Sequence, residues 1–438
     1  MKKILATILA LASVLGLAAC SERNLPLTGS TPTSDSASSS DPAQTSDPTT
    51  SDEVIENKTF APIEITGDNV LNSVRIFDTM YTNENQAMFS PLSLNMCLGM
   101  LEAGAAGSSK EALDAYLGNT DYAAFASEYM EHAKDFNSAV NNDYQKYKNV
   151  FEIANSFWAS EQRKFNEDYK QTVGENFAAE IENVDFLKPK KAAKIINDWV
   201  NEKTHKMIPT IVREDQLTED TAAVVVNTVY FESAWSDEWW VTGEKEAFTN
   251  ADGSTTDTGL MRNGGDSYFE NDNATAFSCR YKNGMYFIGI LPKKEGDFTL
   301  ESLDLSSLLK TESYEYDVYA RMPKLNFESS FPLTDVLKAA GLDIIFDPDF
   351  ADFTPMEGDP DNQQFYISEV MQKTKLELDE EGTRAAAVTA AIVADASAAV
   401  MPVEREKKEV YLDRPFAFLI YDNEADQIVF MGKVTQLD

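Results

Sequence analysis

The segment from Thr221 to Phe231 constrains the fold more than any other part of the chain. It reads Thr-Ala-Ala-Val-Val-Val-Asn-Thr-Val-Tyr-Phe, so it is apolar at nearly every position. A strand with one face in water would alternate between apolar and polar side chains, whereas a run of this kind is typical of a strand buried on both faces. The sequence therefore predicts a central strand of a large sheet.

The other expected elements place helices first and strands later. Helices are expected at 70–81, at 92–101 (opened by Pro91, closed by Gly104 and Gly107), at 110–117 (capped by Ser108 and Ser109, stopped by Gly118), and at about 121–137, 163–178, 191–206 and 332–340. Further strands are expected at 284–292, 314–323, 364–379, 409–421 and 426–435. This order predicts the α+β class. No Pro/Gly-rich break follows residue 55, which predicts one domain over 55–438.

The first 54 residues have the composition of a processing segment followed by a tether. Lys2 and Lys3 precede an apolar run that is too short for a membrane span and ends in Leu17-Ala18-Ala19-Cys20. This tetrapeptide resembles the lipobox of bacterial lipoproteins, which implies a signal peptide over 1–19 and a lipid on Cys20. An ordinary signal peptide with a chance cysteine is the alternative. Residues 20–54 are rich in Ser, Thr, Pro and Asp, which predicts a disordered tether. The expected location is the bacterial cell envelope, membrane-anchored at the outer membrane or cell surface.

The charge and the rarity of histidine exclude several classes of function. The formal charge of -36 repels nucleic acid and anionic membrane surfaces, so neither is an expected partner. His132 and His205 are the only histidines in the sequence, and neither has a Cys or His at metal-ligand spacing. No metal or cofactor is therefore expected, and a hydrolase is disfavoured because its base would have to be one of these two rings. Cys97 and Cys279 are expected to be separate buried thiols, with a disulfide as the alternative.

Six short motifs, in one order, carry a family resemblance over residues 60–438. They are Phe89-Ser90-Pro91-Leu92-Ser93 with the Leu-Gly-Met-Leu-Glu-Ala-Gly stretch that follows, Ile153 to Trp158, Asn197 to Thr204, Val226 to Phe231 with Trp235, Pro323-Lys324 before Phe327-Glu328, and Arg414-Pro415-Phe416 with Met431 to Val434. Together they resemble the serpins, the serine protease inhibitor family. The resemblance implies three β-sheets, about eight or nine helices and an exposed reactive centre loop.

The most specific motif is similar to the hinge of inhibitory serpins. It runs Glu381-Gly382-Thr383-Arg384-Ala385-Ala386-Ala387, and the residues after it would form the reactive loop. Residues 382–400 are nearly uncharged and lack proline, which is unusual for a surface loop. With a period of two, one face carries only small or β-branched side chains: Thr383, Ala385, Ala387, Thr389, Ala391 and Val393. The segment therefore suits a strand that enters a sheet, although an alanine run could also form a helix.

The resemblance implies a mechanism and a scissile bond. A target proteinase would attack the loop, become acylated, and be carried away as the cut loop inserts into the main sheet. The bond is expected at Ala396-Ser397, and a small residue before it suits elastase-like or subtilisin-like proteinases. The stretch from 397 to Arg414 is longer than usual, so Ala399, Val400 and Met401 stay open as alternatives.

Four further residues are implied to form the polar shutter beneath the opening strands. Ser90, Ser93 and Asn227 occupy shutter positions, and Gln372 stands where the family often has a histidine. Ordinary capping and core hydrogen bonding are the alternative roles for them.

The resemblance implies that the protein is a monomeric, extracellular inhibitor and not an enzyme. Two other functions compete with this assignment. A non-inhibitory serpin-fold binding module is disfavoured because Thr383 and the alanine run suit insertion. A surface hydrolase or carbohydrate-binding lipoprotein is disfavoured by the scarcity of histidine. The expected partners are the target proteinase, in a covalent acyl complex, and the membrane lipid.

Overall fold

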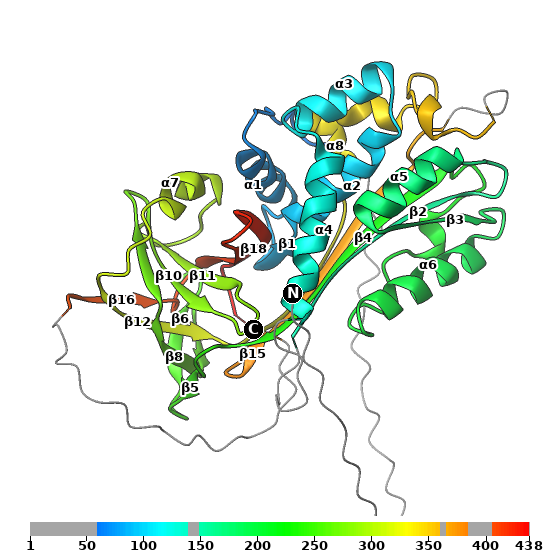
Figure 1. Ribbon diagram of the computed structural model, residues 1–438. Helices are drawn as coiled ribbons and strands as arrows, with labels where there is room; N and C mark the ends of the chain where they lie inside the picture. Colours follow the sequence, from blue (N-terminus) through cyan, green and yellow to red (C-terminus); the bar gives the residue numbers. More distant parts are fainter. Residues whose placement is uncertain (1–58, 139–148, 360–364, 384–404, 438) are drawn as a thin grey trace, which may run out of the picture. The chain divides into compact units, whose positions relative to one another are not determined.

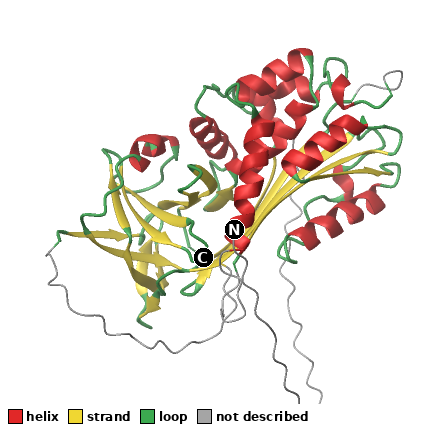
Figure 2. Cartoon of the chain, viewed as in Figure 1, coloured by secondary structure: helices red, strands yellow, loops and turns green. Residues whose placement is uncertain are grey.

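The computed structural model describes residues 59–138, 149–359, 365–383 and 405–437, all within the compact unit Glu56–Asp438. In these residues the chain forms eight α-helices, three larger β-sheets and one two-stranded hairpin (Figures 1 and 2). Helices dominate the first part and strands the later part, which confirms the α+β class and the three expected sheets.

The helices begin where the sequence offers a cap or a proline. The Asp68 carboxylate accepts the backbone N–H groups of Val70 and Leu71 at the start of the first helix, and Ser90 caps the second helix just before Pro91. The helices are α1 (Asn69–Met80), α2 (Pro91–Ala103), α3 (Gly107–Tyr116), α4 (Tyr122–Ser138), α5 (Glu167–Phe177), α6 (Pro189–Lys203), α7 (Leu305–Leu309) and α8 (Thr334–Leu337).

The strands are arranged in a main sheet and two others. The main sheet has the order β13 (Leu325–Pro332), β14 (Glu369–Leu378), β15 (Gly382–Thr383), β4 (Ala223–Ala234), β2 (Val150–Ser160), β3 (Ala179–Val184). The second six-stranded sheet has the order β1 (Gln86–Phe89), β18 (Gln427–Val434), β17 (Phe416–Asp422), β11 (Tyr286–Pro292), β10 (Ala274–Arg280), β9 (Ser267–Glu270). The four-stranded sheet is β16 (Lys407–Tyr411), β12 (Asp317–Pro323), β8 (Leu260–Gly265), β5 (Trp240–Val241), and the hairpin pairs β6 (Glu246–Thr249) with β7 (Thr255–Thr258).

Strand β4 is buried on both faces, as its apolar run predicts. Ala223 and Val225 pack into the larger hydrophobic core, while Val224 and Val226 pack into a second core on the opposite face. The second core is closed by α6 and by residues 207–217, which cover this face of the main sheet (Figure 1). The sheet therefore lies between two apolar layers, and any strand added beside β4 would be buried too.

Two expected boundaries differ from the structure for local reasons. The strand expected at 409–421 is two strands, β16 and β17, in different sheets, and Pro415 lies between them, where a residue without an N–H group cannot continue a ladder. The helix expected at 332–340 is the short α8, continued by a π-turn in which Gly341 takes a φ of 84°.

The expected caps of α3 are wrong. The helix starts at Gly107, and its N-cap is Ala106, which makes no side-chain cap bond. Ser109 is buried inside the first turn, where its hydroxyl accepts the backbone N–H of Asp352 at 2.9 Å. The serine is therefore used for a tertiary contact instead of a cap.

Cys97 and Cys279 are free and buried, which confirms the expectation of separate thiols. Burial raises the pKa of the Cys97 thiol to about 12, so this sulfur is inert at neutral pH. In the described part of the chain, no three His, Cys, Asp or Glu side chains gather as metal ligands, and no helix is long and apolar enough to cross a bilayer.

Candidate functional site

The main sheet is incomplete between β14 and β4. At one end the two strands pair directly and in parallel, with Gln372 opposite Asn227. At the other end β15 lies between them, where Thr383 pairs with Leu378 on one side and with Ser233 on the other. Between these points, residues 373–377 and 228–232 face each other, and no described strand pairs with these two edges. We call this part of the sheet the slot.

The pairing pattern fixes the shape of the slot. Directly paired strands are about 4.8 Å apart, so an interposed strand requires about twice that separation. The two strands therefore diverge from the Gln372–Asn227 end toward Thr383. The slot is a wedge that is closed at one end and already holds the first residues of an added strand at the other.

Gly382 can approach β4 only because it lacks a side chain. A Cβ at this position would collide with the backbone oxygen of Ser233 and lie 2.7 Å from the Cα of Ala234. The turn before it is fixed by the Asp379 carboxylate, which accepts the Glu381 N–H at 2.9 Å. The Trp235 indole N–H donates to the Asp379 carbonyl at 2.9 Å, which binds the turn to the end of β4.

Thr383 points into the larger core. It is only 3% exposed, and its hydroxyl lies 2.7 Å from the hydroxyl of Tyr281. The Tyr281 ring stacks on Trp235, with ring centroids 4.3 Å apart and an interplanar angle of 12°. This contact fixes which face of β15 is buried, and the face would stay the same along any continuation of the strand.

Glu380, in the turn, forms an ion pair with Lys324. Burial raises the pKa of the Glu380 carboxyl, but the hydrogen bond and the charge of Lys324 outweigh it, so the pKa lies below its ordinary value. The carboxylate is therefore ionised at neutral pH and ties the turn to the loop between β12 and β13.

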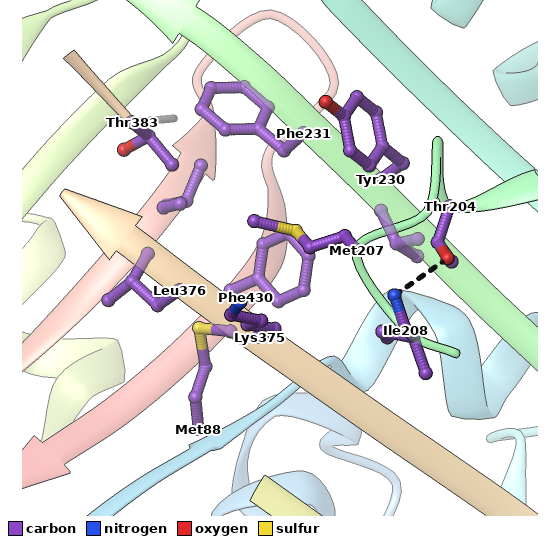
Figure 3. Close-up of a pocket in the computed structure, with 12 residues that line it drawn as sticks. Met88, Thr204, Met207, Ile208, Tyr230, Phe231, Lys375, Leu376, Thr383 and Phe430 are labelled. Atoms are coloured by element: carbon purple, nitrogen blue, oxygen red, sulfur yellow. Dashed lines mark hydrogen bonds between the residues drawn. The ribbon is translucent and has the colours of Figure 1, made fainter. Parts of the chain in front are cut away.

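A small pocket in the slot shows which side chains an added strand would meet (Figure 3). On the core side it is lined by Met88, Phe231, Leu376, Ile420 and Phe430, next to Thr383. On the other side it is lined by Thr204, Met207 and Ile208, and the Ile208 N–H donates to the Thr204 hydroxyl at 3.1 Å.

Residues 204–213, which we call the cover segment, cross the slot. Met207 and Ile208 pack in the second core with residues of β4, while the Lys373 ammonium of β14 donates to the Thr210 carbonyl at 3.0 Å. A strand that filled the slot would have to displace this segment or pass beneath it.

The four expected shutter residues meet at the closed end of the slot. The Gln372 amide accepts the Ser90 N–H at 2.9 Å and donates to the Ser90 carbonyl at 3.0 Å. The Ser90 hydroxyl accepts the Ser93 N–H at 3.2 Å, and the Ser93 hydroxyl donates to the Asn227 amide oxygen. All four side chains are buried. This polar cluster joins α2 to both strands that border the slot.

The sequence interpretation missed one member of this network. Asn155 of β2 lies opposite Asn227 and accepts a hydrogen bond from its amide, while its own amide donates to the Phe177 carbonyl at 2.7 Å. The polar pair Asn155-Ser156 inside the otherwise apolar 153–158 motif was the available signal. The network therefore extends across β2 to α5.

Several expected site residues lie outside the described part of the chain. They are Arg384, Ala385, Ala386 and Ala387 of the hinge, Ala396 and Ser397 of the scissile bond, and the lipidation residue Cys20. The two histidines are described, and the Nε2 atom of each ring lies 3.0 Å from a carboxylate oxygen: that of His132 from Asp422, and that of His205 from Glu152.

A family model described as serpin (serine protease inhibitor) matches residues 71–437. The chain belongs to the serpin family. Its relatives include an uncharacterised serpin-like protein of Thermococcus kodakarensis, 29% identical over 398 residues and 88% of each chain. Human neuroserpin is also 29% identical, over 80% of this chain and 86% of neuroserpin. Membership supports proteinase inhibition as the general function and is consistent with a protein that is not a catalyst.

Solved serpin structures have the same fold. Native tengpin, a thermophilic serpin, superimposes with a TM-score of 0.71 at 27% identity, covering 87% of this chain and 98% of tengpin. Arabidopsis AtSerpin1 in its native stressed conformation gives a TM-score of 0.73 at 22% identity, covering 84% of this chain and 96% of that one. Thyroxine-binding globulin in complex with thyroxine gives a TM-score of 0.66 at 22% identity, covering 84% of this chain and 97% of that one.

Proposed function

We propose that this serpin is an irreversible suicide-substrate inhibitor of serine proteinases, with elastase-like and subtilisin-like enzymes as the main targets and cysteine proteinases as a further class. The observation that supports the proposal best is β15. Gly382 and Thr383 already lie between β14 and β4, and the slot beyond them is bordered by two strand edges without described partners. A cut in the loop would let residues after Thr383 continue the strand.

The chemistry uses the nucleophile of the proteinase. Its serine oxygen attacks the carbonyl of Ala396, the bond to the Ser397 nitrogen breaks, and the new amine leaves with a proton. The proteinase then remains bound through an ester to Ala396. As residues from Arg384 onward enter the slot, the proteinase is carried toward the closed end, and its distorted active site fails to hydrolyse the ester.

The direction of Thr383 supports insertion of this particular sequence. Because Thr383 faces the larger core, Ala385 and Ala387 would face it as well, against side chains such as Phe231, Leu376 and Phe430. Small side chains can fill the space beside these large ones without overpacking. Arg384 would fall on the opposite face, toward the cover segment, where its charge would avoid the core.

One gel separates inhibition from the alternatives. The protein is mixed with pancreatic elastase or subtilisin, boiled in detergent and separated by size. We expect a covalent band at the summed mass less that of the carboxyl-terminal fragment, and amino-terminal sequencing of this released fragment should begin at Ser397. Fragments without a covalent band would contradict inhibition and favour the non-inhibitory binding module. A fragment that begins at 400, 401 or 402 would move the scissile bond to Ala399, Val400 or Met401.

We further propose that the inhibitor is anchored outside a bacterial cell by a lipid on Cys20. The support is the sequence alone: the Leu17-Ala18-Ala19-Cys20 motif and the Ser/Thr/Pro/Asp-rich stretch over 20–54. A monomer held by such a tether would reach proteinases beyond the membrane surface. Labelling of cells with a fatty-acid analogue should mark the protein, and Cys20→Ala should abolish the label. An unlabelled protein would indicate an ordinary signal peptide.

A further inference from the structure

A pocket lies between three helices and the second six-stranded sheet. It is lined by residues of α1 and α2, the start of α4, the turn between β17 and β18, and β18 itself (Figure 1). Its volume is about 230 Å³, far more than a single buried water molecule requires. None of its lining residues belongs to β4, β14 or the cover segment, so the pocket is separate from the slot.

Three residues that line the pocket carry side-chain oxygens without hydrogen-bond partners among the described residues. They are Asn69 and Ser73 of α1 and Asn95 of α2. Ser73 is 1% exposed and Asn95 is 8% exposed. The Asn69 amide nitrogen donates to the Leu117 carbonyl at 3.5 Å, so the oxygen is the end of this amide that lacks a partner. Asn69 and Ser73 are four positions apart, which makes them neighbours on one face of α1.

The chemistry of these oxygens indicates what the pocket lacks. Buried polar atoms without partners are uncommon in folded proteins, because each has lost its contact with water and gained nothing in return. Amide oxygens only accept hydrogen bonds, and a serine hydroxyl can accept one as well. A protonated primary amine has three N–H donors and no acceptor, so it matches a set of three such oxygens.

The charge of the lining favours a cation. Of the described residues that line the pocket, only Asp426 is charged, and none is a lysine, an arginine or a histidine. Asp426 and Thr120 are exposed, so they mark the mouth of the pocket. The Tyr421 hydroxyl donates to the Asp426 carboxylate, which holds this group in the turn. The formal charge of -36 on the whole chain also attracts cations and repels anions.

The other walls of the pocket are apolar. Leu92 of α2, Phe125 of α4, and Ile428 and Met431 of β18 line it, and three of these four side chains are buried. Small-molecule sites typically combine such walls with a few polar groups that fix the orientation of the ligand. A ligand for this pocket should therefore carry an apolar group next to its amine.

We propose that this pocket binds a small organic cation, a protonated amine attached to an apolar body about the size of a phenyl ring. The ammonium group donates to the oxygens of Asn69, Ser73 and Asn95, and the apolar body packs against the walls formed by α2, α4 and β18. Asp426 supplies the negative charge at the mouth. The inference is independent of the proposed function, because no residue of the slot or of the reactive loop takes part in it.

The test compares ligands that share a shape and differ in charge. Phenethylamine is the cation, phenethyl alcohol the neutral analogue and hydrocinnamate the anion. Their binding to the unaltered chain is measured by isothermal titration calorimetry at low salt and neutral pH. We expect phenethylamine to bind at millimolar concentrations or below, the alcohol to bind more weakly, and the anion not to bind.

Two variants test the residues that the proposal names. Ser73→Ala removes one of the three oxygens and should weaken amine binding by about tenfold, the effect of one hydrogen bond to a charged group. Asp426→Asn removes the charge at the mouth and should weaken it by about threefold, because an exposed ion pair contributes little. Asn also tolerates the positive φ of 53° at position 426, so the turn is kept.

Two matched variants control for general effects of these substitutions. Thr228→Val removes another buried hydroxyl that has no partner among the described residues, in β4 and outside the pocket. Glu424→Gln removes an exposed negative charge from the same turn as Asp426, at a position that does not line the pocket. Both should bind phenethylamine like the unaltered chain, and none of the four variants should lower the melting temperature.

Absence of phenethylamine binding, or equal binding of the three ligands, would overturn the inference. Equal amine binding by Ser73→Ala, Asp426→Asn and the unaltered chain would overturn it too, as would a crystal structure of the amine-soaked protein that shows only ordered water in the pocket. Failure of the proposed function has a different readout, because it appears as a missing covalent band with active proteinase while the titrations are unchanged.

Discussion

The size of the stabilisation on loop cleavage follows from the slot. Residues 373–377 of β14 and 228–232 of β4 offer five positions on each edge, so an inserted strand would form about ten backbone hydrogen bonds. At about 1 kcal/mol net for each bond, the cut protein should be more stable by about 10 kcal/mol. The entropy of unfolding for a unit of roughly 380 residues is about 0.8 kcal/mol/K, so the melting temperature should rise by about 12 °C.

The assay compares intact and nicked protein by scanning calorimetry. Brief digestion with elastase should cut within 384–404, and mass spectrometry locates the cut before the scan. Since Thr383 faces the core, Ala387→Arg would place a charge on the inserting face, and the nicked variant should melt close to the intact protein. Ala386→Arg lies on the opposite face and should retain most of the rise.

Two results would refute this reasoning. If the nicked and intact proteins melt within a degree or two of each other, the slot does not accept the loop. If Ala386→Arg and Ala387→Arg behave alike, the direction of Thr383 does not extend along the inserted strand, and the face assignment is wrong.

Three further predictions concern the ends of the slot. Gln372→Leu leaves the buried N–H of Ser90 without a partner, while the Ser90 carbonyl keeps the Leu94 N–H, so urea unfolding should show a loss of about 1–3 kcal/mol, and an unchanged midpoint would contradict the role of the polar cluster. Lys324 holds the pKa of Glu380 below its ordinary value in the folded state. The ionised Glu380 therefore stabilises the fold above the ordinary glutamate pKa, and this contribution is lost as the pH falls through the folded pKa. The Glu380→Gln variant should lose less stability on acidification than the unaltered chain, and parallel pH profiles of the two would refute this. Gly382→Ala should displace β15 from β4, measured as more loop cleavage for each covalent complex formed, whereas an unchanged ratio would show that the turn can move to accommodate a Cβ.

The sequence predicted the long elements and the polar cluster, but it did not predict that β15 lies between β14 and β4 at one end of the slot. The apolar run at β4 and the helical spacing at α1 are local signals that survive in the fold. The meeting of Ser90, Ser93, Asn227 and Gln372 was expected only through family resemblance, since these residues are far apart in the chain. Asn155 was missed because periodicity does not show that a strand residue will find a buried polar partner.

The short strands could not be predicted from the sequence for a different reason. β15 has two residues, and its place depends on the register of Leu378 and Ser233, which are distant in sequence from each other. β5 also has two residues and β9 has four, and the pairing of both is decided by the neighbouring strands. Nothing in two to four residues distinguishes such strands from a turn.

The pairing of β1 with β18 has a consequence for how this protein is made. Gln86 lies opposite Val434, so an early strand of the second sheet waits for a partner synthesised almost 350 residues later. A ribosome still translating 427–434 holds a chain in which Phe89 and its neighbours have no β18 to pair with. The second sheet therefore closes only after residues 427–434 have been synthesised, and a stop codon before residue 427 should yield a product that proteases remove.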